Sequence, residues 1–368
     1  RLVFKFDDLS GKVKRYYYTV LHCDAGWNES FIRQSEYIDG FPDNPIDDYA
    51  RSFNTTFSYV NYYLELPNER IRFKTSGNYI LLVYEDNNKD KLVLSRRFYI
   101  TEPLVTVEAT VRRATTDAFK GENQEVDFVV YHEKLRIENP RDEVKVVVMQ
   151  NNRWDNANKD IMPTFVRGNS LEYNTENNCV FPGGKEWRWL DLRSFRLQSD
   201  RVERADYKKN ATDMYLFTDV DRSAQKYVYF RDLNGMYLVE SYEAINPYWQ
   251  GDFATVHFRL AAPNGIPFAN KDIFLAGQLT NYEFNDKTRM VFNAESGMYE
   301  TSAYLKQGYY NYTYIAVDKE NPAVRRDLEG DYWETENSYT ILMYYKSFTD
   351  RTDQLIGIGR INSRTDQP

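Results

Sequence analysis

Tyrosine is the residue that most constrains the fold of this chain. It accounts for 31 of 368 residues and stands beside 22 Phe and 6 Trp. Aromatic and β-branched side chains suit the pleated, half-buried surface of a sheet. Long stretches rich in Ala, Leu and Glu, which favour helices, are absent from the sequence. We therefore predict an all-β protein.

The hydrophobic pattern indicates short strands joined by turns. Residues 104–112 alternate between apolar and polar side chains, as a half-buried strand does. Residues 79–85 and 91–100 are strand-like runs on either side of an Asx-rich turn, which predicts a hairpin. A further strand is expected over 225–230, and one short helix over 30–37. This pattern is typical of tandem immunoglobulin-like β-sandwich domains.

Length and turn signals suggest where these domains begin and end. At about 100–200 residues per domain, the chain holds two or three of them. We expect the ranges 1–103, 104–250 and 251–368. The spacing of strands and glycines in the last range resembles the early-set immunoglobulin-like modules that bind glycogen or starch. A glycan-binding protein is therefore the alternative hypothesis, although Tyr282 stands where such modules carry an exposed Trp.

Charge and hydropathy argue against nucleic-acid binding and against a membrane-spanning helix. The chain has 47 basic and 55 acidic residues, a net charge of −8 and a pI near 5.2. Phosphate contacts need clustered Lys and Arg, so we expect no nucleic acid as a partner. No run of 18 or more apolar residues occurs, so we predict no direct membrane span.

The two cysteines, Cys23 and Cys179, are too few for a disulfide framework. A single bridge between them stays open from the sequence. They fall in different expected domains, however, and each lies on or near its own strand. We therefore predict two unbridged, buried thiols.

Patterns for catalysis or metal binding do not stand out. His22 and Cys23 are neighbours on a predicted strand, so their side chains face opposite sides and do not form a nucleophile–base pair. The close Cys and His pairs that zinc needs are absent. Acidic pairs such as Asp219 with Asp221 leave a loop calcium site as an alternative, without an EF-hand pattern. Paired acids for glycoside hydrolysis also stay open, because they meet in space rather than in sequence. We predict no cofactor and no enzymatic activity.

The stretch from Tyr16 to Leu66 carries a more specific signal. Strand-like segments at 16–23 and 56–66 flank a polar connection that contains the words HCD-x-x-W, EYIDGF, DDY and SxNT. In this order and spacing, these words resemble the plug protein family of the type IX secretion system of Bacteroidetes, over about residues 1–103. The residues that carry the resemblance are Tyr16, Tyr18, His22, Cys23, Asp24, Trp27, Glu36, Tyr37, Gly40, Phe41, Asp48, Tyr49, Ser52, Asn54, Thr55 and Tyr62.

The resemblance implies a protein that closes a secretion pore and catalyses no reaction. A plug of this family is a periplasmic protein attached to the large outer-membrane β-barrel translocon of the type IX system, whose wide lumen would leak if left open. The resemblance implies no cofactor, and it does not define the surface that contacts the barrel. We expect Trp27 to hold the polar connection onto the first sandwich. The motif residues expected to be structural are His22, Cys23, Asp24, Trp27, Tyr37, Gly40, Asp48, Tyr49, Asn54 and Thr55.

Overall fold

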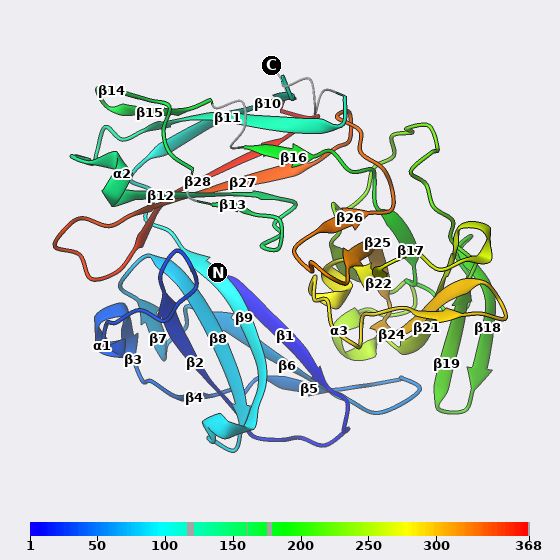
Figure 1. The fold of residues 1–368 in the computed structure, drawn as a ribbon. Helices are drawn as coiled ribbons and strands as arrows, with labels where there is room; N and C mark the ends of the chain where they lie inside the picture. Colours follow the sequence, from blue (N-terminus) through cyan, green and yellow to red (C-terminus); the bar gives the residue numbers. More distant parts are fainter. Residues whose placement is uncertain (116–120, 160, 175–178, 367–368) are drawn as a thin grey trace.

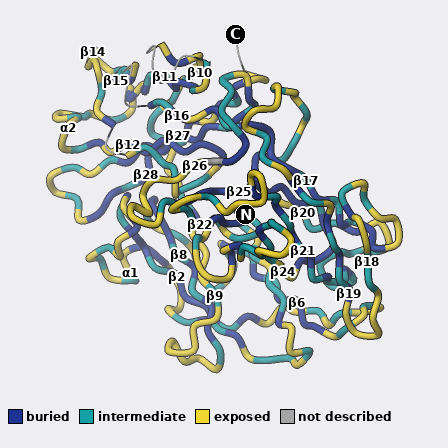
Figure 2. The backbone as a smooth tube through the Cα atoms, turned by 45° about the vertical axis from the view of Figure 1, so that its right-hand side comes forward, coloured by how far each residue is buried: buried dark blue, intermediate teal, exposed yellow. Residues whose placement is uncertain are grey.

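The computed structural model describes residues 1–115, 121–159, 161–174 and 179–366. Strands make up 47% of the structure and helices 6%, so the all-β prediction is confirmed. The sheets pack against one another with apolar cores between them, which appear as dark segments inside the molecule in Figure 2. In the described part of the chain, we distinguish a first, a second and a third packed unit (Figure 1).

The first unit is the sandwich of the N-terminal region, blue to cyan in Figure 1. Its elements are β1 Leu2–Asp8, β2 Tyr16–Cys23, α1 Gln34–Tyr37, β3 Ile38–Gly40, β4 Asn44–Pro45, β5 Tyr49–Arg51, β6 Val60–Leu66, β7 Ile71–Phe73, β8 Gly77–Glu85, the short 3-10 helix η1 Lys89–Lys91 and β9 Leu92–Ile100. One sheet has the order β1-β6-β5 and the other β4-β2-β8-β9, while β3 pairs with β7. Alternation places Phe4 and Phe6 of β1 against the core, where Phe6 stacks on Tyr62.

The second unit combines strands from the middle and the end of the chain. Its elements are β10 Thr106–Arg113, β11 Asn123–Tyr131, α2 Pro140–Glu143, β12 Val144–Gln150, β13 Asn158–Lys159, β14 Phe165–Arg167, β15 Ser170–Tyr173, β16 Val180–Pro182, β27 Ser338–Tyr345 and β28 Gln354–Asn362. One sheet has the order β10-β11-β15-β14, with β16 also on β11, and the other has the order β13-β12-β27-β28. One core joins the two sheets, as a sandwich requires.

The third unit contains the remaining strands. Its elements are β17 Arg188–Asp191, β18 Val202–Lys208, β19 Ala211–Leu216, β20 Tyr237–Val239, α3 Pro247–Gln250, β21 Phe253–Ala261, η2 Pro263–Gly265, β22 Lys271–Ala276, η3 Gln278–Thr280, β23 Val291–Asn293, β24 Met298–Lys306, β25 Gly308–Asp318 and β26 Arg325–Asp327. One sheet is built around β25, which pairs with β17, β20, β22 and β26, and the other has the order β18-β19-β21-β24-β23. The helices are single turns, and none in the described ranges is long and apolar enough to cross a bilayer.

Strand pairing departs from the expected ranges 104–250 and 251–368 in two places. β27 and β28 lie in the last range, yet β27 pairs with β12, with Leu342 opposite Val147. Buried side chains of β27 belong to the core of the second unit. β17 to β20 lie in the middle range, yet Leu190 of β17 pairs with Tyr310 of β25 and is buried in the core of the third unit. Turn signals mark where strands end, whereas pairing depends on partners far away in the sequence.

The strand expected over 225–230 is absent, so that prediction is wrong. Side chains rather than a backbone ladder tie this segment to its surroundings. The hydroxyl of Tyr227 lies 2.9 Å from the carbonyl oxygen of Glu334, and Val228 is left 66% exposed. The helix expected over 30–37 is reduced to its last turn, α1.

Candidate functional site

The motif turn from His22 to Trp27 is built around one carboxylate. Oδ1 of Asp24 accepts hydrogen bonds from the backbone nitrogens of Gly26 at 2.8 Å and of Asn28 at 2.9 Å. Capping a tight turn through its own side chain is a common role of Asp. The turn places Trp27 at φ +69°, a left-handed conformation that is uncommon for a bulky residue. Local hydrogen bonding therefore presents the indole beyond the end of β2.

His22 is a buried structural residue. Its Nε2 lies 3.0 Å from the carbonyl oxygen of Ser76, and its Nδ1 lies 2.9 Å from Oγ of Ser30. Because a carbonyl only accepts, Nε2 carries the proton and Nδ1 accepts from the Ser30 hydroxyl. Burial lowers the pKa of His22 below its usual value. The ring is therefore neutral, and it packs edge-on against Tyr79 with centroids 4.9 Å apart.

Neither cysteine resembles a nucleophile. Cys23 follows His22 on β2 and so faces the other side of the strand. Burial raises the pKa of the Cys23 thiol to about 11 and that of Cys179 to about 12. Such thiols stay protonated at neutral pH and react slowly. Both are free, as predicted, and Cys179 lies in the core of the second unit.

The indole of Trp27 connects the first unit to the second. It packs edge-to-face on Trp154, with ring centroids 5.3 Å apart, and lies 5.7 Å from the ring of Tyr99 on β9. The guanidinium of Arg97 lies 4.7 Å from the same indole. Because Trp154 follows β12, Trp27 bridges two units instead of packing on the first sandwich alone. We call this contact, with the polar pairs around it, the first joint.

Polar groups complete the first joint. The backbone nitrogen of Ala25 donates to Oδ2 of Asp353 at 3.0 Å, and Nζ of Lys145 lies 3.0 Å from the same oxygen. The buried hydroxyl of Tyr344 donates to Oδ1 of Asn78 at 2.7 Å. These bonds join the end of β2 and the start of β8 to β12, β27 and the loop before β28. A buried carboxylate with both a cation and a backbone donor is well compensated.

The loop from Ser52 to Tyr59 forms a second joint, toward the third unit. The buried hydroxyl of Tyr59 donates to the carbonyl oxygen of Gly251 at 2.7 Å. The backbone nitrogen and the hydroxyl of Thr56 donate to the two carboxylate oxygens of Asp252, at 2.7 and 2.9 Å. Two acceptors on one side chain therefore fix the loop against the start of β21.

An aromatic group and a buried ion pair reinforce the second joint. Phe253 lies 5.3 Å from the ring of Tyr59 and stacks on Tyr304 at 5.2 Å. Nζ of Lys306 lies 2.8 Å from Oδ2 of Asp7 and 4.3 Å from the centroid of the Tyr59 ring. Burial lowers the pKa of Lys306, and the charge of Asp7 opposes that effect. The ammonium group thus lies between an anion and an aromatic face.

Tyr37 and Gly40 shape the first sandwich itself. The hydroxyl of Tyr37, a buried residue, donates to the carbonyl oxygen of Val20 at 3.2 Å. Gly40 has φ +128°, and a Cβ there would lie 1.9 Å from the carbonyl oxygen of Arg70. Only glycine fits so close an approach of two backbones. Both residues therefore serve the packing of β3, β7 and β2.

The remaining motif residues lie near the second joint or on an exposed edge. Asn54 adopts a left-handed φ of +60°, and the hydroxyl of Thr55 donates to the carbonyl oxygen of Phe57 at 2.8 Å, so both shape the loop. Asp48 and Tyr49 are exposed beside and on β5. The structure thus spreads the motif over the two joints, the interior of the first sandwich and an exposed edge, and does not gather it into one pocket.

Sequence reasoning missed the partners of these joints. Asp353, Tyr344, Asp252 and Lys306 lie 196–328 positions along the chain from the residues of the first unit that they contact. Each reads in the sequence as an ordinary strand or turn residue. Only spatial pairing gives them their role, and no local signal could have identified them.

The acidic pair around Asp219 is accounted for by arginines. Oδ1 of Asp219 lies 2.6 Å from the guanidinium of Arg188, and Arg201 also reaches it. Oδ2 accepts from the hydroxyls of Tyr312 at 2.9 Å and Tyr314 at 2.8 Å. Arginine and tyrosine partners keep the pKa of this carboxyl low despite its burial. Among the described residues, no group of three or more His, Cys, Asp or Glu side chains is placed to hold a metal ion.

Tyr282 is not an exposed sugar platform. Its ring packs edge-to-face on Trp187 with centroids 6.2 Å apart, and the guanidinium of Arg153 lies 5.2 Å from it. Its hydroxyl donates to the carbonyl oxygen of Gly235 at 3.2 Å. The residue that aligns with the sugar-stacking position of starch-binding modules is therefore occupied by contacts within the protein.

Comparison with known proteins agrees with the motif. The family model of the type 9 secretion system plug protein 1st domain matches residues 1–102. A solved structure of a hypothetical protein from Parabacteroides merdae is 34% identical and covers 98% of this chain and 90% of its own, with a TM-score of 0.93. No curated protein matches this chain. The similarity to the solved structure spans the three units, and the family implies a periplasmic component of type IX secretion. The chain belongs to the type IX secretion system plug protein family.

Proposed function

We propose that this protein binds the periplasmic end of the large outer-membrane β-barrel translocon of type IX secretion and seals it reversibly. The match of residues 1–102 to the plug family is the observation that carries the proposal. The protein acts as a stopper and not as an enzyme. In this reading, it stays attached to the translocon in the periplasm until cargo or another partner displaces it.

The two joints support this role in physical terms. The first joint holds the second unit through Trp27, and the second joint holds the third unit through Tyr59. A body whose parts are fixed before binding loses less conformational entropy when it docks. It also resists deformation better than units on free linkers, which helps a seal over a wide opening. The motif residues thus contribute to sealing by setting the shape of the whole molecule.

Reversibility limits the kind of contact. A seal that must release is expected to bury about 1,200–2,000 Å² in total, the usual size for specific complexes, with a polar rim. An obligate interface would be larger and more apolar. The net charge of −8 is compatible with a contact that depends on complementary charge.

The test compares cells with and without this chain. Deletion should leave the translocon barrel in the outer membrane but raise the uptake of an antibiotic that the membrane normally excludes. The tagged chain should recover the barrel from detergent-solubilised membranes, and expression of the chain from a plasmid should restore the barrier. Unchanged permeability together with failure to recover the barrel would contradict the proposal.

Glycan binding is not favoured as a second function. The position that would stack on a sugar, Tyr282, contacts Trp187 and Arg153 instead. A panel of immobilised polysaccharides provides the direct comparison. Retention of the chain on any of them would revive the alternative.

A further inference from the structure

The first unit has an open seam between its two sheets. β1 pairs with β6, β9 pairs with β8, and neither has a second neighbour among the described strands. Both strands therefore present a free edge of backbone donors and acceptors, which is the template on which a further strand adds. Figure 1 shows the two strands side by side on the same side of the unit.

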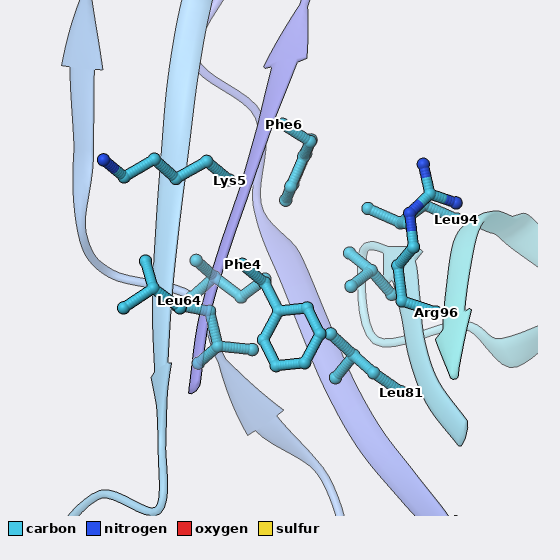
Figure 3. A pocket seen from close by; sticks show the side chains of 10 residues that line it. Phe4, Lys5, Phe6, Leu64, Leu81, Leu94 and Arg96 are labelled. Carbon is cyan, nitrogen blue, oxygen red and sulfur yellow. The ribbon is translucent and has the colours of Figure 1, made fainter. Parts of the chain in front are cut away.

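An apolar cavity of about 170 Å³ opens at this seam (Figure 3). Strands β1 and β9 supply its two sides, and side chains of the core close its floor. Cavities of about 150 Å³ with such a lining accept a benzene-sized group, so one large apolar side chain fits. The apolar residues that line it include Phe4, Phe6, Leu64, Leu81, Val83 and Leu94.

The mouth of the cavity carries an uncompensated cation. Arg96 points to the core side of β9, two residues after Leu94, and is exposed. Its guanidinium bonds only to the neighbouring carbonyl oxygen of Ser95, and no carboxylate of the described residues lies within ion-pair distance. Lys5 also lines the cavity, but its ammonium group lies 3.2 Å from the Tyr248 ring centroid and extends away from Arg96 in Figure 3.

Contacts with the other two units hold the outer faces of β1 and β9 in place. The outer face of β1 meets the third unit through Asp7 and Lys306. The outer face of β9 meets the second unit through Tyr99, whose hydroxyl accepts a 2.7 Å hydrogen bond from Nε1 of Trp154. The joints thus fix the two strands while leaving the gap between them open. A groove fixed in this way is organised before a ligand arrives.

We propose that this seam binds an extended segment of a partner protein, which adds as a strand to β9 and places an apolar and an acidic side chain two residues apart. The apolar side chain enters the cavity beside Leu94, and the carboxylate pairs with Arg96. Side chains two residues apart share one face of a strand and lie about 7 Å apart, which is the spacing of Leu94 and Arg96 on β9. Strand addition with a side-chain pocket is an established mode of peptide recognition.

The charge argues for an acidic partner rather than a second copy. Antiparallel pairing of two β9 strands about Arg96 would place two guanidinium groups side by side, which is unfavourable. Inward-pointing charge on an edge strand discourages such self-pairing. A segment with a carboxylate at that position gains an ion pair instead. The seam can bind such a segment whether or not the translocon is the partner.

Fluorescence anisotropy of a labelled peptide on the full chain tests the seam. The probe is the nine-residue peptide Thr-Val-Thr-Glu-Thr-Leu-Thr-Val-Thr, and its counterpart carries Lys in place of Glu. We expect the Glu peptide to bind with a Kd below about 1 mM. Arg96→Glu should weaken that binding at least about tenfold and should reverse the preference toward the Lys peptide. Arg360→Glu, an exposed arginine on β28, is the matched control and should change neither affinity.

Hydrogen exchange locates the bound peptide. Amides of β9 should gain protection in the complex, whereas those of β28 should not. Absence of binding at about 1 mM, equal affinities for Arg96→Glu and the unmodified chain, or protection confined to other strands would overturn the proposal. So would a dimer in sedimentation analysis in which the amides of β9 are protected without peptide, because the seam would then belong to a second copy.

Discussion

Trp27 and Trp154 meet edge to face, with ring centroids 5.3 Å apart, although 127 positions separate them in the sequence. One indole belongs to the family motif, and the other belongs to the loop after β12. Their contact locks the first unit to the second. A motif residue that looks like a local turn feature is thus part of a connection across the molecule.

We predict that Trp27→Ala lowers the free energy of unfolding by about 3–5 kcal/mol, as truncation of a buried Trp usually does. Trp154→Ala should lose part of the same energy, with a coupling of about 0.5–1.5 kcal/mol for the aromatic pair. Chemical denaturation of both single variants and the double variant measures that coupling. Strictly additive effects would show that the two rings contribute independently.

The second joint is tested by removing one hydroxyl. Tyr59→Phe deletes the donor to the carbonyl oxygen of Gly251 and should destabilise the protein by about 1–3 kcal/mol, because a buried acceptor loses its partner. Tyr49→Phe is the matched control, since Tyr49 is 49% exposed. Urea titrations of the two variants should differ. Equal midpoints would argue against a structural role of the Tyr59 hydroxyl.

The protonation of His22 should be visible in the pH dependence of stability. Its folded pKa lies below the unfolded value near 6.5, so the unfolded chain binds the additional proton. Stability from this residue is therefore complete above about pH 6.5 and falls as the pH drops toward the folded pKa, by up to about 1.4 kcal/mol per pH unit. His22→Gln keeps a donor for Ser76 and should flatten this part of the profile. A variant profile parallel to that of the wild type would refute the assignment.

Gly77 is required next to His22. A Cβ at this position would lie 2.4 Å from Nε2 of His22, on a backbone with φ +144°. Gly77→Ala should therefore destabilise the protein by about 2 kcal/mol more than Gly168→Ala, which has φ +55° but an open surrounding. Thermal melts of the two variants provide the comparison. Equal decreases in melting temperature would mean that the His22 ring moves aside without a loss of stability.

The two thiols should be inert in the folded protein. Cys23 and Cys179 are buried, and burial raises both pKa values. Alkylation in native buffer should leave the intact mass unchanged, whereas alkylation in denaturant without reductant should add two labels. A chain that takes up label in denaturant only after reduction would contain a disulfide.

Much of the strand content could be predicted from local pattern. The aromatic and β-branched run at 16–23 becomes β2, and the hairpin expected over 79–100 becomes β8 and β9. Side-chain alternation is a local property, so one sequence reveals it. The segment 225–230 shows the limit of this reasoning, because its aromatic and β-branched residues find no neighbouring strand and side chains hold the segment in place instead.

The amino-acid sequence by itself determined the all-β class, the family and the residues of the motif. Side-chain alternation, turn residues and short sequence motifs can all be read from neighbouring positions in the chain. The tertiary structure decided where β27 and β28 belong and what the motif does. Leu342 meets Val147, and Ala25 meets Asp353, only when distant segments are brought together. Such pairings are selected by the shape of a common core and by the need of each buried polar group for a partner. The shape of the core and the partner of a buried polar group both depend on distant segments, so the residues next to a given position in the sequence do not reveal them.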